Sequence, residues 1–596
     1  MKPVALLAAL GIAALGPLTG AQASTDAATE WKFPIDPLWS WPTVEENNAA
    51  PPSLERRGGD YGHGKGHGKG KGKEKHGKGK GNGHGKCKPK PEKPVNTTCF
   101  RYYKDCTKDA LTTSLPDIDY DFGEMYSGNI AINPSKPNDT LFYVFKPKDG
   151  APVDELTIWL TGGPGCSSLF GFMREIGPIM WAEGQIKARE NPYAWSKLTN
   201  VLFVDQPVGT GFSTGTPTAK SSADVAVQFA DWFKEFQNKF GIKNYRIFVT
   251  GESYGGRWVP YISAEFLNRA DKATYDLKGS LIYSASIGDE LSQQDNLPAL
   301  PFAKRKRDYY AFPDEKIASL QAQADRCGFT AWFDKYMTFP PPGPQPVGEG
   351  LNQACYLSGE VMFSAVKRNV CFDQNNINRQ CPVPDDEVFG LFGNNFVPGS
   401  YIGKTLYFER PEVVKALHAP TSKRFTMCTR GVLVGADDAW RNDESLPPTQ
   451  HVLPQVIDAT QRVIMINGDL DGNIPPEGTL LAIQNMTWGG QLGLQSKPAD
   501  TFFVQMMERQ FIDLTFSIGF PPPAPFFGGQ GPMGTYTKER GLVWVHQLQA
   551  GHSVPEQQGR ASVMHLEWLL GHREGFGPND QTAYTDGDTR PGARFD

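Results

Sequence analysis

A serine lies inside a short motif with glycine at both ends, Gly251-Glu252-Ser253-Tyr254-Gly255. The motif follows a β-branched and aromatic run, residues 245–250, that is typical of a strand, and it precedes an amphipathic stretch through Ile262 and Phe266. This is the strand, turn and helix context of the G-x-S-x-G nucleophile elbow, whose glycines permit a strained turn that exposes the serine hydroxyl. Ser253 is therefore the predicted nucleophile, and the Tyr254 N–H is predicted to face the reacting carbonyl group.

A serine hydroxyl becomes an effective nucleophile when a histidine takes its proton and an acid orients that histidine. Both residue types follow predicted strands later in the chain. Gly468-Asp469-Leu470-Asp471 comes after the apolar run 463–466, and Gly551-His552-Ser553 comes after the run 541–548. Because α/β sheets carry their active-site groups on loops that follow strands, both positions suit a Ser, Asp and His triad.

The sequence contains competitors for two of these roles. His546 lies within a predicted strand and His565 on a predicted helix, 561–570, so His552 is the better candidate for the general base. Asp469 and Asp471 both remain candidates for the acid, although Asp469 directly follows Gly468 and is better suited to shaping the turn.

A tetrahedral intermediate needs a second N–H donor besides that of Tyr254. Gly162-Gly163-Pro164-Gly165 follows the predicted strand 155–160 and offers backbone that a substrate can approach closely. Gly163 is the predicted donor. Ser167 and Ser168 lie in the same loop but lack an elbow, and they are not predicted to be nucleophiles.

Strands and helices alternate around these motifs, which predicts an α/β fold with a largely parallel sheet and helices on both faces. Strands are predicted at 140–146, 155–160, 201–205 and 245–250, and a helix at 223–240. Four cysteines and a proline-rich stretch interrupt this rhythm, which predicts a disulfide-containing cap inserted into the core. The predicted organisation is a signal peptide over 1–23, a disordered propeptide or arm over 24–95, core halves over 96–289 and 401–571, a cap over 290–400 and a flexible tail over 572–596.

The composition is that of an ordinary globular protein, and its charge distribution argues against nucleic-acid binding. The 596 residues carry a net charge of −5, but residues 62–86 contain eight lysines and one acid, so that tract is +7 and the rest of the chain is −12. Only a weak, salt-sensitive contact of residues 62–86 with polyanions is predicted. No cofactor is predicted. No metal site is predicted either, because lysines surround the four histidines of the tract, namely His63, His67, His76 and His84.

Residues 1–23 have the charged start, apolar run and small-residue end of a secretory signal. No later stretch is long and apolar enough for an integral membrane segment, so the mature protein is predicted to be secreted, with vacuolar delivery as the alternative. Secretion makes Asn96, Asn138 and Asn485 candidate glycan acceptors. The nine cysteines leave at least one unpaired, with Cys87 the best candidate, and a local Cys99–Cys106 bridge is predicted.

Taken together, the motifs resemble those of the serine carboxypeptidases, a branch of the α/β-hydrolase fold. Seven stretches match in family order from about residue 99 to residue 571: residues 160–168, 191–195, 205–209, 251–255, 410–413, 468–471 and 550–555. The resemblance implies release of single amino acids from the free C-terminus of a peptide or protein. It assigns the acyl-enzyme to Ser253, acid and base catalysis to His552, and orientation of the imidazole to Asp471.

The resemblance also implies a site for the substrate's terminal carboxylate. Glu175 and Glu252 are the family's acids at this site, with Trp159 beside them, while Thr161 stands where the family usually has Asn. Like charges roughly 4 Å apart repel by about 4 kcal/mol at an effective dielectric near 20, so one of the two acids is expected to hold a proton and peptide hydrolysis to be favoured at acidic pH.

Family pattern further pairs Cys166 with Cys428. Two other functions stay open at this stage. One is an esterase or acyltransferase of the same fold, which Thr161 leaves room for. The other is a secreted scaffold that holds an anionic surface through its lysine-rich arm, against which the intact Ser253, Asp471 and His552 set argues.

Overall fold

The computed structural model describes residues 97–346, 353–392, 395–396, 405–435, 443–504 and 529–580. The predicted signal peptide and arm, with the 62–86 tract, Cys87 and Asn96, lie outside these ranges, as do the residues of the predicted tail beyond residue 580.

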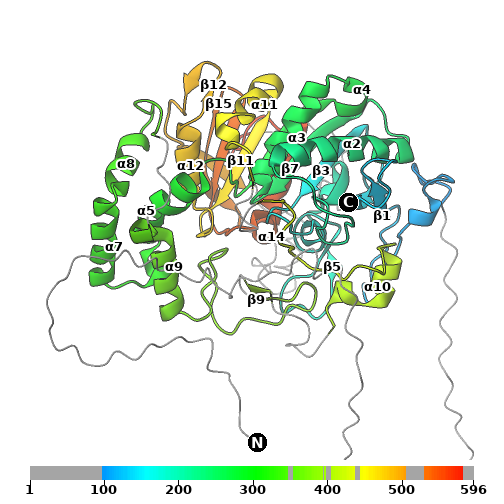
Figure 1. Cartoon of the computed structure of the whole chain (residues 1–596), viewed down its shortest axis with the longest axis horizontal. Coiled ribbons are helices and arrows are strands. Elements are labelled where there is room, and N and C mark those ends of the chain that lie inside the picture. The colour runs from blue at the N-terminus through cyan, green and yellow to red at the C-terminus, as the bar shows by residue number, and fades with distance from the viewer. Residues whose placement is uncertain are drawn as a thin grey trace, which may run out of the picture. The chain divides into compact units, whose positions relative to one another are not determined.

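A ten-stranded sheet forms the centre of the described chain (Figure 1). Its five inner pairings, from β6 to β16, are parallel, and the two pairings at each edge are antiparallel. The strands in spatial order are β1 (Tyr126–Ala131), β2 (Thr140–Lys146), β6 (Asn200–Asp205), β3 (Glu155–Leu160), β7 (Arg246–Glu252), β8 (Leu277–Tyr283), β11 (Val463–Gly468), β16 (Leu542–Gln547), β15 (Gly531–Glu539) and β14 (Asp500–Val504).

Both faces of this sheet are apolar, because successive side chains of a strand point to opposite faces. In β3, Ile158 belongs to one buried cluster and Trp159 to the other. Helices α2 (Ser222–Phe240), α3 (Gly255–Arg269) and α11 (Leu453–Thr460) cover the first face, and α15 (Gly559–Leu570) covers the second. The predicted α/β class, mostly parallel sheet and two-sided helical cover are confirmed.

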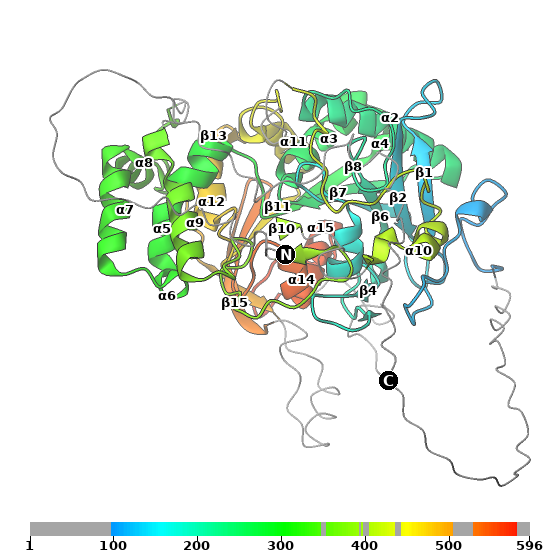
Figure 2. The same cartoon turned by 60° about the horizontal axis from the view of Figure 1, so that its bottom comes forward.

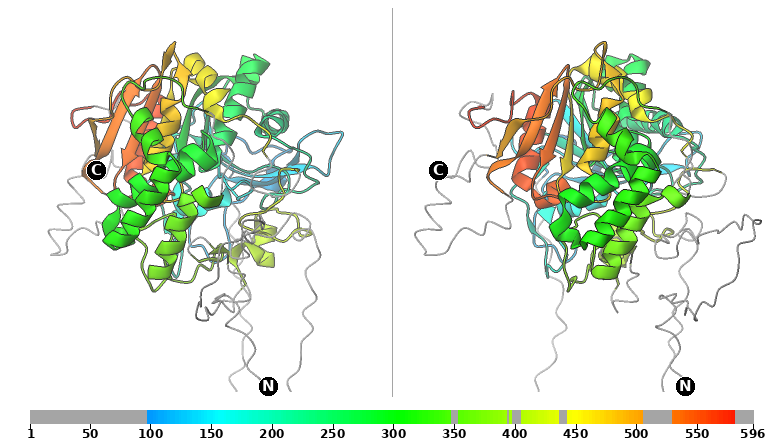
Figure 3. Two further views of the ribbon diagram at one scale, coloured as in Figure 1. Left: turned by 60° about the vertical axis from the view of Figure 1, so that its left-hand side comes forward. Right: turned by 90° about the vertical axis from the view of Figure 1, so that its left-hand side faces the viewer.

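Helices α5 to α9, which follow β8 in the chain, form a separate group beside the sheet (Figures 1 and 2). Figure 3 turns this green group of helices toward the viewer. Their shared apolar cluster includes Leu300, Phe302, Tyr310, Leu320 and Leu357. The helices are α5 (Leu297–Arg305), α6 (Arg307–Tyr310), α7 (Asp314–Arg326), α8 (Phe329–Tyr336) and α9 (Leu357–Arg368).

Two disulfides lie within the range predicted as a cap, Cys327–Cys355 and Cys371–Cys381. After them come two short strands, β9 (Leu391–Phe392) and β10 (Asn395–Phe396). The remaining short elements lie around the core: α4 (Lys272–Tyr275), α10 (Pro411–Ala416), α12 (Pro476–Gln484), α14 (Val554–Gln557), β4 (Ile179–Met180), β5 (Arg189–Glu190), β12 (Thr487–Trp488) and β13 (Gln491–Leu492).

One local prediction is wrong: Cys99 and Cys106 are both exposed and unbridged, and the Cys106 thiol instead lies 3.2 Å from the Lys239 carbonyl oxygen. The helix predicted at 223–240 is α2, which buries the stripe of Val225, Phe229 and Phe233 and turns Val227, 45% exposed, to solvent.

Candidate active site

The sheet brings four separate loops to one edge. Strands β3, β7, β11 and β16 run parallel to one another, and only β8 lies between β7 and β11. Since the carboxyl ends of parallel strands share an edge, the loops that carry Thr161, Ser253, Asp471 and His552 all start from that edge. These residues come from widely separated parts of the chain, and sheet order is what collects them.

Ser253 occupies the turn between β7 and α3 in a left-handed backbone conformation, with φ of 63°. Such a conformation is strained for a residue with a side chain, and surrounding bonds must hold it. The Ser253 N–H donates to the Tyr283 carbonyl (2.9 Å), and the Ser253 carbonyl accepts from the N–H groups of Gly256 (2.8 Å) and Ser286 (3.1 Å). A β-carbon at Gly256 would lie 2.4 Å from the Ser286 nitrogen, so glycine is required there. This geometry is the predicted elbow.

His552 and Asp471 form a buried pair, with Nδ1 of the histidine 2.9 Å from Oδ2 of the aspartate. The other oxygen of Asp471 accepts from the backbone N–H groups of Asn473 and Ile474, both at 2.9 Å, which fixes the carboxylate in orientation. Burial lowers the pKa of His552, but the adjacent Asp471 and the more distant Glu252 outweigh it and raise the pKa to about 9. Because the Nδ1–H of His552 is directed at Asp471, the other ring nitrogen, Nε2, is the one that can accept and donate a proton.

The competing residues are engaged elsewhere. Asp469 pairs with Arg305 and Lys306 at the C-terminal end of α5 and with Nε2 of His546 at 2.9 Å. Burial raises the pKa of Asp469, but the hydrogen bonds from His546 and Lys306 and the charge of Arg305 outweigh it and hold the pKa below its usual range. His565 is fully buried in α15, where burial lowers its pKa to about 3. Of the two acids, only Asp471 therefore contacts His552.

The glycine loop after β3 lies against the elbow. A β-carbon at Gly162 would stand 2.4 Å from the Tyr254 nitrogen and 2.7 Å from the Ser253 β-carbon, so only glycine allows this approach. Gly163 has φ of 114°, which also favours glycine. The backbone of both predicted N–H donors, Gly163 and Tyr254, therefore belongs to segments that meet beside Ser253.

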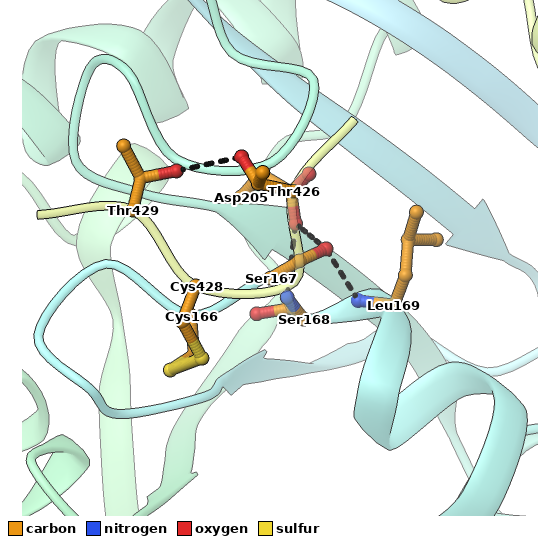
Figure 4. Close-up of a disulfide and its surroundings, with 8 residues drawn as sticks. All are labelled: Cys166, Ser167, Ser168, Leu169, Asp205, Thr426, Cys428 and Thr429. Carbon is orange, nitrogen blue, oxygen red and sulfur yellow. Dashed lines mark hydrogen bonds between the residues drawn. A yellow bond between two sulfur atoms is a disulfide. The ribbon is translucent and has the colours of Figure 1, made fainter. Parts of the chain in front are cut away.

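Two devices anchor this loop (Figure 4). Cys166 is bridged to Cys428, as the resemblance implies. Asp205, at the end of β6, accepts from the Ser167 hydroxyl (2.6 Å) and from the Ser168 N–H (2.9 Å). Burial raises the pKa of Asp205 to about 6 in spite of these bonds. Ser167 and Ser168 thus hold the loop in place.

Glu175 and Glu252 face each other in the interior, 0% and 3% exposed. Glu175 ends a π-helical turn, Gly171–Glu175, and Glu252 ends β7. Burial raises the pKa of Glu175 well above its usual range, and the negative charge of Glu252 raises that pKa further. Burial also raises the pKa of Glu252. Neither oxygen of Glu175 has a hydrogen-bond partner among the described residues, so ionising both carboxyl groups is unfavourable and one of them favours its protonated form.

Trp159 and Thr161 bond to each other beside this region. The Trp159 indole N–H donates to the Thr161 hydroxyl at 3.2 Å, and the Thr161 N–H donates to the Ser168 hydroxyl at 3.1 Å. The Thr161 hydroxyl therefore keeps its own proton available for another acceptor.

Sequence reasoning missed two residues next to the carboxyl pair. The Ser553 hydroxyl donates to Glu252 at 3.3 Å. Glu556 is largely buried in α14, and burial, opposed by Arg174, raises its pKa to about 7. Both residues follow His552 within four positions of the sequence. Their closeness to the predicted base could have identified them as candidate site residues.

Among the described residues, no group of three or more His, Cys, Asp or Glu side chains is arranged to hold a metal ion. No helix among them is long and apolar enough to cross a membrane. Of the two described glycan acceptors, Asn138 is exposed, whereas Asn485 is half-buried and accepts a hydrogen bond from the Gln345 N–H at 2.8 Å.

The sheet order, the elbow and the histidine and aspartate loops define a serine hydrolase of the α/β-hydrolase fold. The prohormone-processing carboxypeptidase Kex1(delta)p of Saccharomyces cerevisiae shares this fold, with a TM-score of 0.59 and 22% identity over 79% of this chain and 96% of its own.

Sequence comparison identifies the family. The serine carboxypeptidase family model matches residues 116–572. Serine-type carboxypeptidase F of Aspergillus niger is 42% identical over 80% of this chain and 89% of its own length. A carboxypeptidase Y homolog of Arthroderma benhamiae is 35% identical over 77% of this chain and 85% of its own. The chain belongs to the serine carboxypeptidase family and is a serine-type carboxypeptidase.

Proposed function

We propose that this enzyme releases amino acids one at a time from the free C-termini of peptides and proteins through an acyl-enzyme on Ser253, and that acidic pH favours peptide hydrolysis. The observation that carries this proposal is the buried Glu175 and Glu252 pair, which adjoins the elbow because Glu252 is the residue before Ser253. An endopeptidase or plain esterase has no use for two interior carboxyl groups at this point.

The catalytic steps follow from the His552 geometry. Nε2 of His552 takes the Ser253 hydroxyl proton as the oxygen attacks the scissile carbonyl carbon, and the N–H groups of Gly163 and Tyr254 stabilise the oxyanion. The imidazolium, held by Asp471, then protonates the leaving amine as the C–N bond breaks. Water attacks the remaining ester, His552 takes its proton, and the acid product leaves as Ser253 regains a hydrogen.

The carboxyl pair supports recognition of the terminal carboxylate. A protonated glutamic acid donates a hydrogen bond to a carboxylate, whereas an ionised one repels it. Thr161, whose hydroxyl proton is available, is a further donor on the loop that follows β3. When pH rises far enough to remove the shared proton, the substrate meets a second negative charge and binds less well.

The same proton affects the catalytic base. Glu252 is one of the charges that raise the pKa of His552 to about 9, so a proton on the carboxyl pair lowers that pKa. At acidic pH the carboxyl pair is protonated, so it can donate a hydrogen bond to the substrate carboxylate. The same protonation removes one of the negative charges that raise the pKa of His552. Asp471 still supports the imidazolium when it forms in the reaction.

The direct test is release of the C-terminal amino acid from an N-blocked dipeptide between pH 4 and 8, with wild type beside Ser253→Ala. We expect wild-type activity to rise toward acid and the variant to lose at least about 10³-fold in kcat, as removal of a triad nucleophile does. Equal rates in the two proteins would reject Ser253 as the nucleophile.

An ester lacking a free carboxylate tests the alternative activity. If wild type turns over that ester faster than the blocked dipeptide at every pH, the protein acts as an esterase or acyltransferase instead. Salt-sensitive retention on a polyanion together with failure of Ser253 to react with a sulfonyl fluoride would favour the scaffold function through residues 62–86.

We further propose that the chain enters the secretory pathway and is secreted or delivered to a vacuole. The leader-like residues 1–23 and the three disulfides support this proposal. Of the two candidate glycan acceptors that the structure describes, Asn138 is the better one, because it is exposed. Expression in a secreting eukaryotic host, followed by peptide mass spectrometry with and without deglycosylation, should locate a glycan on Asn138; an unmodified Asn138 would contradict this assignment.

A further inference from the structure

A loop of the cap contacts both catalytic loops. It runs from Cys371 to Cys381, which a disulfide joins, and it belongs to the segment between β8 and β11. The His552 N–H donates to the Asn375 carbonyl at 2.7 Å, and the Gly472 N–H donates to the Gln374 carbonyl at 2.8 Å. Adjacent carbonyl groups of one loop thus hold the backbone of His552 and of the residue after Asp471.

Glycines make this contact close. A β-carbon at Gly551 would lie 2.2 Å from the Asn375 carbonyl oxygen, and one at Gly472 would lie 2.9 Å from a methyl group of Ile377. The Ile377 N–H also donates to the Leu470 carbonyl at 3.1 Å. The cap loop is therefore packed directly on the backbone of both catalytic loops.

Asp373 holds the turn that presents Asn375. It is 3% exposed, and one of its oxygens accepts from the Asn375 N–H at 2.9 Å. Its other oxygen pairs with Nε of Arg379 at 3.0 Å, and Arg379 pairs with Glu183 at 2.8 Å. Asp373 thus links the turn at Asn375 to Arg379 near the other end of the loop. Arg379 in turn links the loop to Glu183, outside it.

We infer that Asp373 is a positioning residue for the catalytic histidine: it fixes the turn whose Asn375 carbonyl holds the His552 backbone, and it contributes negative charge near the imidazole. This inference rests on the proposed function, because it takes His552 as the general base. It extends the site to an acid from the cap, which the triad does not include.

The charges around both groups support this role. Those that raise the pKa of His552 are Asp471 from the loop after β11, Glu252 from the elbow and Asp373 from the cap. Around Asp373 itself, burial raises the pKa, and Arg379 and His552 oppose that rise while Glu183 adds to it. Removing the charge of Asp373 should therefore lower the pKa of His552 while Asp471 still orients the ring.

Two variants separate geometry from charge. Asp373→Asn keeps an oxygen acceptor for the Asn375 N–H but removes the charge, whereas Asp373→Ala removes both. Glu315→Gln is the matched control, because Glu315 is an exposed acid on α7 of the same cap. Measurements are kcat and KM on the N-blocked dipeptide, with active sites counted by sulfonyl fluoride labelling, and the pH dependence of the labelling rate.

We expect kcat per labelled site to fall by about 10- to 100-fold in Asp373→Ala, as a misplaced catalytic group does, with KM changed less than about twofold. Asp373→Asn should recover part of kcat. In both variants the ascending limb of the labelling rate should move to lower pH, since less negative charge faces His552. Glu315→Gln should match wild type.

A role limited to folding would lower the midpoint of thermal unfolding yet leave kcat per labelled site and the pH limb unchanged, and that result would overturn the inference. If Asp373→Ala does not fold, the test is the pH dependence of the labelling rate in Asp373→Asn: an ascending limb at the same pH as in wild type would overturn the inference. Failure of the proposed function is distinguishable, because wild type would then show no Ser253-dependent labelling or hydrolysis before any Asp373 variant is compared.

Discussion

Glu252 and Glu175 are both buried in the protein interior, although one ends a central strand and the other a π-helical turn. Burial raises the pKa of both carboxyl groups, and the charge of Glu252 raises the pKa of Glu175 further, so one of the two favours its protonated form. In the proposed function this proton couples substrate binding to catalysis, since Glu252 also raises the pKa of His552. The pH dependence of the enzyme should therefore differ between substrates with and without a free carboxylate.

The first prediction concerns two substrates of one enzyme. For a blocked dipeptide, kcat/KM should fall as pH rises, because loss of the shared proton sets a second negative charge against the substrate carboxylate. For an ester without a carboxylate, kcat/KM should rise with pH, because His552 loses its proton and becomes a base. Parallel profiles for the two substrates would refute the assignment of the pair.

A second prediction isolates Glu175. Glu175→Gln cannot ionise, so the alkaline fall in dipeptide kcat/KM should flatten, and kcat/KM at acidic pH should drop by about 10-fold or more because an amide N–H donates a weaker hydrogen bond to a carboxylate than a carboxylic acid O–H does. Hydrolysis of the carboxylate-free ester should change by less than about threefold. Steady-state kinetics of both substrates from pH 4 to 8 checks this, and an unchanged dipeptide profile would remove Glu175 from the site.

Thr161 offers a matched pair of substitutions. Thr161→Val keeps the shape but removes the hydroxyl donor, so KM for the dipeptide should rise by about 3- to 10-fold, the value of one ordinary hydrogen bond. Thr161→Asn supplies the longer amide donor that the family usually has, and KM should fall. The ester is the control; equal KM shifts on ester and dipeptide would mean that Thr161 supports the loop through Trp159 instead of binding the carboxylate.

Stability should increase as pH falls from about 8 to about 5. Asp205, Glu556, Glu175 and Glu252 all have pKa values raised by burial, the first two to about 6 and about 7. The folded state therefore binds protons that the unfolded chain, with carboxyl pKa values near 4, does not bind. His552, raised to about 9, acts in the same direction as pH falls through that value, whereas His565, lowered to about 3, opposes the others below about pH 6.5, where the histidine of the unfolded chain binds a proton.

The midpoint of thermal unfolding measured across pH 5 to 8 tests this sign. Glu556→Gln should reduce the rise in the midpoint between pH 8 and pH 5, whereas Glu315→Gln, on an exposed site, should leave it unchanged. Asp469, whose pKa lies below its usual range, loses its stabilising charge only at pH below this window. A midpoint that falls on acidification from pH 7 to pH 5 would contradict the prediction.

The disulfides should differ in their effect on stability. Cys166–Cys428 closes a sequence separation of 262 residues and Cys327–Cys355 one of 28. In the chain-entropy model, replacing the first pair by serine should cost about 2 kcal/mol more unfolding free energy than replacing the second. Denaturant unfolding of the two double variants measures the difference. Only the first should also lower kcat, because Cys166 anchors the loop of Gly163; equal kcat losses would argue against that anchoring.

Much of the core and the triad could be predicted from sequence because the signals are local. Ser253 is marked by glycines and by a strand before and a helix after it, and the β3 and β11 strands are apolar runs whose ends place Gly162 and Asp471 on loops. The Cys166–Cys428 bridge could be anticipated only through family resemblance. Local position, with Asp469 directly after Gly468, favoured Asp471 but did not exclude Asp469, since both acids lie on the same turn.

Tertiary contacts resolved what these local signals left open. Asp469 forms ion pairs with Arg305 and Lys306, whereas Asp471 is the acid that contacts His552. Cys99 and Cys106, close in sequence, remain unbridged, whereas the Cys371–Cys381 loop lies on both catalytic loops. The reason is physical: backbone conformation and strand patterning depend on neighbours in the chain, whereas burial, ion pairing and shared protons depend on which distant segments the sheet and cap bring together.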